Sequence, residues 1–225
     1  MSRIVTLIGA TGLIGGNLLE LLLKDRSIHT IRALVRKTIV SSDPKLQQFV
    51  INFEDPKAYE PHMAGAEAVF CAVGTTNSKV KGDKELYKKV DFDIPVFAAK
   101  AAAKCGVYAF ALVSSVGANP ENNQNFYLKL KGVTEEAVCK EMIPSVYIMR
   151  PSLILGERNE RRFTEKLAQS VMPAISWALS GSAAKYKAIK AEDVAQAMQA
   201  AVNSGIKGIY FYDYNGMKNL IGQPA

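Results

Sequence analysis

The chain alternates between short apolar runs and longer stretches with helical periodicity. Seven runs, each nearly continuous in apolar residues, predict buried strands over residues 3–9, 30–36, 46–52, 66–74, 107–115, 145–152 and 208–213. Between them, apolar positions recur every three or four residues. This spacing predicts helices over residues 13–25, 84–106, 126–142 and 192–205.

Three features mark the ends or bends of these helices. Gly106 is expected to end the second helix, because glycine readily adopts the left-handed conformation found just after a helix. Pro95 lies inside the same stretch and is expected to kink it. Glu192 and Asp193 stand at the start of the last helix, where carboxylates oppose the helix dipole.

Strands that are apolar on both faces and alternate with helices are typical of a parallel sheet covered on both sides. The expected fold class is therefore α/β, with a doubly wound parallel sheet whose ligand lies at the carboxyl ends of the strands. No linker interrupts the chain, so residues 1–225 are expected to form one domain. Residues 151–190 break the alternation and are expected to cover the cleft, the alternative for their apolar half being a packing helix.

A glycine-rich loop, GATGLIGG, joins the first strand to the first helix. Its Gly9, Gly12 and Gly15 allow a tight turn, close approach of a pyrophosphate to the backbone, and close packing of helix on strand. The amide groups at the start of the helix would then face the phosphates. The loop predicts nucleotide binding, the alternative being a glycine turn without a ligand. No Gly-Lys-Ser/Thr follows, which argues against a P-loop NTPase.

The end of the second strand indicates which dinucleotide is bound. NAD-binding proteins place an acid about 20 residues after the loop to hold the ribose hydroxyl groups. Here Arg36 and Lys37 occupy that place, and a guanidinium accommodates a 2′-phosphate. NADP(H) is therefore preferred, NAD(H) remains possible, and the alternative for Arg36 is a solvated charge at a strand end.

A tyrosine and a lysine four residues apart suggest the chemistry. Tyr127 and Lys131 lie on one face of the predicted helix 126–142, after a strand that ends in Ser114 and Ser115. A phenol beside an ammonium can pass a proton to or from a substrate oxygen, and a serine hydroxyl can orient that oxygen. The same spacing recurs at Tyr186/Lys190 and Tyr214/Lys218, so position and not spacing selects the first pair. The alternative is a solvated helix face whose tyrosine packs on the sheet.

Together, GATGLIGG, the VSS strand end, YLKLK and RPSLILG resemble an atypical short-chain dehydrogenase/reductase of the NAD(P)-binding Rossmann family. FCAVGTT and RPSLILGERNE make the chain most similar to the Tat-interacting oxidoreductase-like subgroup. The resemblance implies that Ser114 or Ser115, Tyr127 and Lys131 form the catalytic set. At the helix position where many relatives carry an asparagine, this chain has Asp91 or Asp93.

The resemblance also implies a set of cofactor-binding residues. At the pyrophosphate these are Gly9, Thr11, Gly12, Leu13 and Ile14, and at the adenosine phosphate they are Arg36 and Lys37. Asn52 and Phe53 would lie near the adenine, and Val73, Gly74 and Thr75 would line the ribose side. Lys131 would also contact the cofactor, Pro151 and Ile154 would border the nicotinamide, and Arg162 would reach the cofactor or the substrate.

Composition and charge limit the classes of protein to which the chain can belong. Hydrophobic residues make up 48% and charged residues 22%, as in a folded globular chain, and the net charge of +7 suits an anionic ligand. No apolar run is long enough to predict a membrane span. Three widely spaced cysteines and the lack of a signal-peptide pattern predict a cytoplasmic protein with reduced thiols. The two histidines have no metal-ligand spacing, so no metal site is expected.

These features predict an NADP(H)-dependent oxidoreductase that acts on a small carbonyl or alcohol, with Tyr127 as proton donor or acceptor. The alternatives are a non-catalytic NADP(H)-binding regulator of a protein partner, and an epimerase or dehydratase that works through bound cofactor. The lysine-rich run 79–89 is expected to be a solvated helix face, so nucleic acid is not an expected partner. Either a monomer or a homodimer is compatible with the sequence.

Overall fold

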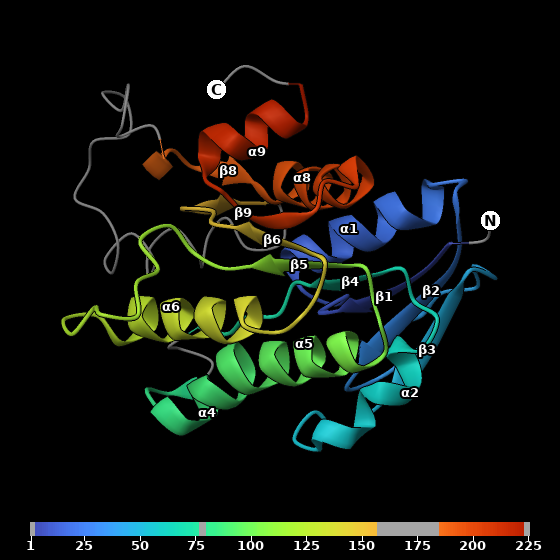
Figure 1. Ribbon diagram of the computed structural model, residues 1–225, viewed down its shortest axis with the longest axis horizontal. Coiled ribbons are helices and arrows are strands. Elements are labelled where there is room, and N and C mark those ends of the chain that lie inside the picture. The colour runs from blue at the N-terminus through green and yellow to red at the C-terminus, as the bar shows by residue number, and fades with distance from the viewer. Residues whose placement is uncertain (1–2, 77–79, 157–184, 223–225) are drawn as a thin grey trace.

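Seven parallel strands form the centre of the computed structural model, which describes residues 3–76, 80–156 and 185–222. Their order across the sheet is β3-β2-β1-β4-β5-β6-β9 (Figure 1). The bounds are Arg3–Ile8 (β1), Ile28–Val35 (β2), Leu46–Val50 (β3), Ala68–Cys71 (β4), Ala109–Val113 (β5), Ser145–Met149 (β6) and Gly208–Tyr212 (β9). Every neighbouring pair is parallel, which confirms the predicted α/β fold with a doubly wound sheet.

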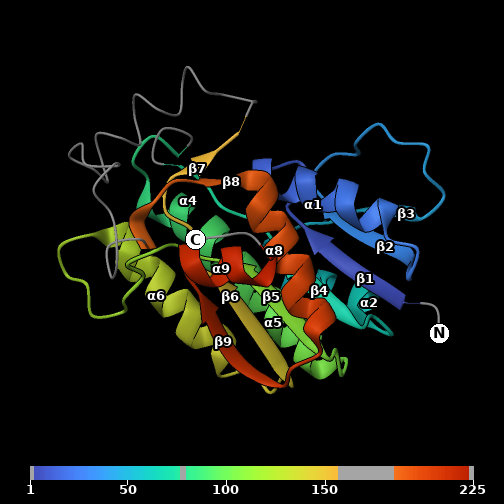
Figure 2. The ribbon, with the colours of Figure 1, turned by 90° about the horizontal axis from the view of Figure 1, so that it is seen from above.

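Helices cover both faces of this sheet (Figures 1 and 2). Helices α1, α8 and α9 pack on one face, and α2, α5 and α6 pack on the other. Their bounds are Leu13–Lys24 (α1), Glu60–Met63 (α2), Ile94–Lys104 (α5), Phe126–Cys139 (α6), Ala191–Ser204 (α8) and Tyr214–Leu220 (α9). Successive residues of β5 enter opposite cores, Phe110 on one face and Ala111 on the other, which explains why this strand is apolar throughout.

Several short elements lie outside the predicted pattern. A 3-10 turn, η1 (Pro56–Ala58), and helix α2 follow β3, and α9 follows β9. Strands β7 (Ile154–Leu155) and β8 (Ile189–Lys190) form a separate two-stranded parallel sheet. They lie in the described parts, 151–156 and 185–190, of the stretch 151–190 that was expected to cover the cleft; residues 157–184 lie outside the described residues.

The predicted helix 84–106 consists of three segments. Helix α4 (Lys84–Lys88) continues into a π-helical turn, η2 (Lys89–Asp93), and then into α5. The interruption therefore lies before Pro95, which sits in the first turn of α5. Proline has no amide hydrogen to donate to the Asp91 carbonyl oxygen. The Thr134 hydroxyl of α6 lies 3.0 Å from that oxygen and shares its hydrogen between it and the Leu130 carbonyl oxygen, at 2.8 Å. Gly106 follows α5 in the left-handed conformation, φ +69°, as predicted.

The order in which the chain adds strands to the sheet reverses beside β1. Strands β2 and β3 lie on one side of β1, and β4, β5, β6 and β9 lie on the other. Ile8, the last residue of β1, pairs with Leu34 of β2 on one side and with Cys71 of β4 on the other. In a doubly wound sheet the ligand lies at this point, beyond the carboxyl ends of the strands. The segments that follow β1, β2, β4, β5 and β6 are therefore the ones to inspect for a site.

Candidate functional site

The glycine loop, residues 9–15, turns tightly between β1 and α1. Gly9 has φ +94°, and a Cβ there would lie 2.6 Å from the Ala72 carbonyl oxygen. A Cβ on Gly15 would collide with the Gly9 carbonyl oxygen, so α1 starts in direct contact with the loop. Gly12 is the N-cap residue of α1 and has no side chain that could accept from the first amides of the helix. Such a cradle of backbone amides fits a pyrophosphate.

Residues that follow β2 and β3 lie beside this loop. Arg36 and Lys37 are exposed and follow β2 directly, one strand away from Gly9. Asn52 and Phe53 follow β3, where the Asn52 side chain accepts a hydrogen bond from the Glu54 amide, at 3.0 Å. The structure therefore places the residues predicted for the adenosine end of the cofactor at the same edge of the sheet as the glycine loop.

The segment after β4, residues 73–76, is called the cofactor loop here because it contains the predicted ribose-side residues Val73, Gly74 and Thr75. Two side chains hold the backbone of Thr75. The Tyr87 hydroxyl donates to its carbonyl oxygen at 3.1 Å, and its amide donates to Asp91 Oδ2 at 2.9 Å. Burial raises the pKa of the Tyr87 phenol, so this group stays a neutral donor.

The two candidate serines differ in their surroundings. The Ser114 amide donates to the Met149 carbonyl oxygen at 2.7 Å, so the sheet pairing extends one residue past β5. By strand alternation Ser114 continues the face of Phe110 and Leu112, which is the face covered by α5 and α6. Its hydroxyl is buried and has no hydrogen-bond partner among the described residues. The Ser115 hydroxyl donates to the Val116 carbonyl oxygen at 3.3 Å.

Tyr127 and Lys131 lie on the first two turns of α6. Asn125 caps this helix by accepting a hydrogen bond from the Leu128 amide, at 3.1 Å. Lys131 Nζ lies 5.9 Å from the centre of the Tyr127 ring, and only 3% of the residue is exposed. Tyr127 itself is half-buried and packs against the Tyr87 ring, at 5.9 Å between centroids.

The other two pairs with the same spacing have different surroundings. Lys218 forms an ion pair with Asp193 at 2.8 Å, and Tyr214 receives Lys187 over its ring at 5.5 Å. Tyr186 is exposed. Of the three pairs, only Tyr127 and Lys131 stand on the helix that follows β5.

Asp91 is the partner of Lys131, and sequence reasoning left its role open. It is fully buried in η2, and its Oδ1 lies 2.8 Å from Lys131 Nζ. Burial alone would lower the pKa of the Lys131 ammonium, but the Asp91 carboxylate, followed by Tyr127, holds that pKa above its ordinary value. The available sequence signal was an acid within an apolar helical stretch, four residues before a proline.

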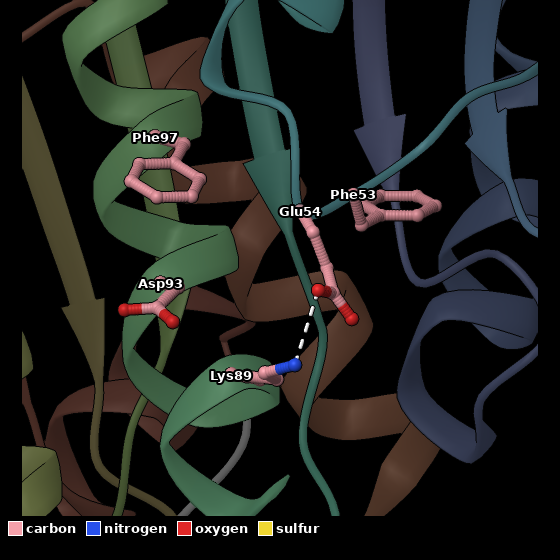
Figure 3. A pocket seen from close by; sticks show the side chains of 5 residues that line it. All are labelled: Phe53, Glu54, Lys89, Asp93 and Phe97. Atoms are coloured by element: carbon pink, nitrogen blue, oxygen red, sulfur yellow. Dashed lines mark hydrogen bonds and ion pairs between the residues drawn. The ribbon is translucent and has the colours of Figure 1, made fainter. Parts of the chain in front are cut away.

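Asp93, the other candidate for that helix position, faces elsewhere. With Phe53, Glu54, Lys89 and Phe97 it lines a hollow of about 120 Å³ between α5 and the segment after β3 (Figure 3). Lys89 and Glu54 form an ion pair of 3.0 Å at this hollow. Of the two acids, therefore, Asp91 is the one that joins Lys131.

The segment after β6 passes over the start of α1. The Pro151 carbonyl oxygen accepts from the Val116 amide at 2.9 Å, which ties this segment to the residues after β5. Ile154 packs into the core on the α1 face, and a Cβ on Gly156 would lie 2.7 Å from Leu13 Cδ1. Pro151 and Ile154 are thus brought to the glycine-loop edge, whereas Arg162 lies outside the described residues.

Within the ranges that the structure describes, no three His, Cys, Asp or Glu side chains are grouped so that they could hold a metal ion. Among those same residues, no helix has the length and hydropathy needed to cross a bilayer.

Comparison with known proteins agrees with this geometry. A family model described as NAD(P)H-binding matches residues 9–205, from the glycine loop to the end of α8. A protein from Debaryomyces hansenii named "Protein FMP52, mitochondrial" is 32% identical over 194 residues, which cover 84% of this chain and 83% of that protein. The family model confirms NAD(P) binding at family level. Membership of the narrower Tat-interacting subgroup stays a prediction.

Two solved structures share the fold at low identity. The oxidoreductase ylbE from Lactococcus lactis has a TM-score of 0.66 and 19% identity, with 99% of both chains covered. The enzyme WbmH from Bordetella bronchiseptica, in complex with NAD+, has a TM-score of 0.70 and 17% identity, with 96% of this chain and 77% of that chain covered. These likenesses establish the Rossmann-type fold.

The relatives correct one expectation. A cytoplasmic protein was expected from the cysteine pattern and the lack of a signal-peptide pattern. Curated relatives from Debaryomyces hansenii, Coccidioides immitis and Candida albicans are instead named mitochondrial, which points away from the cytoplasm. Unpaired, widely spaced cysteines indicate a reducing compartment, and they do not identify which one.

Proposed function

Because the chain belongs to the NAD(P)H-binding family, we propose that it is an NADP(H)-dependent oxidoreductase of the short-chain type, acting on a small carbonyl or alcohol. The observation that carries this proposal is the buried, charged Lys131, held against the Tyr127 ring on the helix after β5. Solvated lysines are far more common than buried ones, so a buried ammonium next to a phenol indicates a function.

Each residue of the site has a separate role in such a reaction. When bound, the nicotinamide cofactor supplies or accepts the hydride. Tyr127 gives a proton to the carbonyl oxygen in reduction and takes it back in oxidation, and the Lys131 ammonium favours the phenolate left behind. The Ser114 hydroxyl, buried and without a described partner, is suited to orient the substrate oxygen.

Cofactor binding is assigned to the edge that carries the glycine loop. The backbone amides at the start of α1 hold the pyrophosphate, supported by the lack of room for a Cβ at Gly9 and Gly15. Arg36, with Lys37 beside it, holds the adenosine 2′-phosphate, because a guanidinium makes forked hydrogen bonds to a phosphate. The cofactor loop and Pro151 to Ile154 border the rest of the dinucleotide.

A fluorescence titration with NADPH and NADH in parallel tests the cofactor. We expect tighter binding of NADPH than of NADH, and loss of that preference in Arg36→Ala, since only NADPH carries the 2′-phosphate. Arg26→Ala removes an exposed arginine just before the start of β2, at the opposite end of the strand from Arg36, and serves as a matched control for net charge. Binding of neither nucleotide by the parent chain would refute the proposal at its first step.

A carbonyl screen with NADPH oxidation as the signal tests the reaction. Tyr127→Phe removes only the hydroxyl and is expected to lower kcat by 10²–10⁴, roughly what a general acid contributes, while NADPH affinity is kept. Tyr186→Phe makes the same change in another tyrosine of the same spacing and is expected to keep full activity. Equal turnover in the two variants would contradict the role given to Tyr127.

A further inference from the structure

Asp91 makes two contacts that join separate parts of the proposed site. Its Oδ1 pairs with Lys131 Nζ at 2.8 Å, and its Oδ2 accepts the Thr75 amide at 2.9 Å. The carboxylate therefore links α6 to the cofactor loop through one side chain. Its main-chain carbonyl oxygen is held as well, by the Thr134 hydroxyl of α6 at 3.0 Å.

The π-helical turn explains how an acid enters this position. In η2 the Asp91 side chain is fully buried, whereas Lys89 and Asp93 on the same turn keep partial exposure. Extra residues in a helical turn rotate side chains away from the regular pattern, and such turns are frequent at functional sites. Here the turn directs a carboxylate inwards.

Charge, and not only shape, distinguishes this side chain from an asparagine. An amide could also accept the Thr75 hydrogen bond, but it could not neutralise a buried ammonium. A lysine without a counter-charge in such a place loses its proton readily, because burial disfavours the charged form. The carboxylate therefore keeps Lys131 charged, which an asparagine at this position would not do.

Among the groups that act electrostatically on Lys131, only Asp91 supplies a negative charge at neutral pH. Glu135, one turn further along α6, is paired with Arg150 instead. The groups that act on Lys131 electrostatically are Asp91 from η2, Tyr127 from its own helix and Cys71 from β4. Burial raises the pKa of the Cys71 thiol to about 12, so this thiol is neutral. Tyr87 of α4 lies near Asp91 and Tyr127 and is likewise a neutral phenol.

We infer that Asp91 is a positioning residue, which keeps Lys131 charged and aligned with Tyr127 and couples this ammonium to the cofactor loop through Thr75. The inference rests on the proposed function for the role of Lys131 in turnover. The contacts themselves, and the charge state that they maintain, can be tested without any turnover.

The first test follows the charge of Lys131 directly. The NMR signal of its ε-carbon, assigned by its absence in Lys131→Met, is recorded from pH 6 to pH 10 in the parent chain and in Asp91→Asn. We expect Lys131 to stay protonated throughout in the parent chain and to lose its proton within this range in Asp91→Asn. Asp93→Asn makes the same chemical change two residues away and is expected to behave like the parent chain.

Two results would overturn the inference. One is a Lys131 that stays protonated to pH 10 in Asp91→Asn. The other result concerns Asp91→Glu, which is used if Asp91→Asn does not fold. This variant retains the negative charge, so loss of the Lys131 proton in it would show that a carboxylate does not keep Lys131 protonated.

A second test measures the coupling to cofactor and chemistry. Asp91→Asn still accepts the Thr75 amide and is expected to bind NADPH within about twofold of the parent chain, whereas Asp91→Ala, which cannot accept it, should bind severalfold more weakly. Equal NADPH binding in both would refute the link to the cofactor loop. Relative to Asp93→Asn, turnover of Asp91→Asn should fall about tenfold between pH 7 and pH 9, as an unpaired buried lysine deprotonates.

The outcomes separate the two proposals. A parent chain that binds NADPH but reduces no carbonyl, with the Lys131 titration as expected, would refute the proposed reaction and leave the role of Asp91 standing. Normal turnover together with an unchanged titration in Asp91→Asn would refute the role of Asp91 alone.

Discussion

Replacing Lys131 by methionine tests how strongly the buried ion pair contributes to the fold. The side chains of Lys131 and Asp91 are 4% and 0% exposed, so the variant leaves a carboxylate buried without its counter-ion. Breaking a buried pair in this way costs about 3–5 kcal/mol of unfolding free energy. With a urea m-value of about 3 kcal/mol/M, the unfolding midpoint should fall by roughly 1–1.7 M.

The assay is urea unfolding followed by circular dichroism, with two comparison variants. Lys104→Met breaks the ion pair with Glu60, which lies on the surface, and is expected to leave the midpoint unchanged within error. The double variant Asp91→Asn/Lys131→Met removes both charges, keeps an acceptor for the Thr75 amide, and should recover most of the loss. If Lys131→Met unfolds at the same midpoint as Lys104→Met, the pair is not the buried, charged pair described above.

Three further predictions concern other parts of the site. Gly132→Ala should lower Tm, because a Cβ there would lie 2.7 Å from the Asn119 amide nitrogen and closer still to other backbone atoms. The overpacking cost of about 1–3 kcal/mol exceeds or cancels the gain of about 1 kcal/mol in helix propensity. Gly15→Ala should abolish NADPH binding in the fluorescence titration, since its Cβ would collide with the Gly9 carbonyl oxygen. Cys71 should resist thiol reagents in the native protein at pH 8 and react only after unfolding, because burial raises its pKa to about 12. As the thiol ionises more easily in the unfolded chain, stability should fall as pH rises above about 8.5.

The strands and main helices were predictable because their signal is local. Each buried strand is apolar on both faces, and each long helix carries its own periodicity, so residues a few positions apart contain the information. The glycine loop was predictable for the same reason, since its context lies within 25 residues of sequence. The parallel pairing of the strands followed from the alternation of elements.

The features that sequence reasoning missed depend on residues far apart in the chain. Asp91 can be buried because Lys131, forty positions later, neutralises it, and the turn η2 is compatible with Pro95 because Thr134 satisfies the freed carbonyl oxygen. Within a local window, only the spacing of four residues to Pro95 distinguishes Asp91 from Asp93. Strands β7 and β8 are only two residues each, too short for a periodic pattern to be recognised.

The central place of β1 in the sheet bears on how the chain folds during synthesis. β1 is made first, yet one of its neighbours is β4, whose last residue, Cys71, follows Ile8 by 63 positions. At about 5–20 residues per second, the ribosome needs roughly 3 to 13 s to add those residues. Throughout that time an apolar strand edge has no partner, and unpaired strand edges are prone to associate with other chains. The same topology that brings the glycine loop to the middle of the sheet thus leaves the nascent N-terminal segment open to aggregation until β4 has been made.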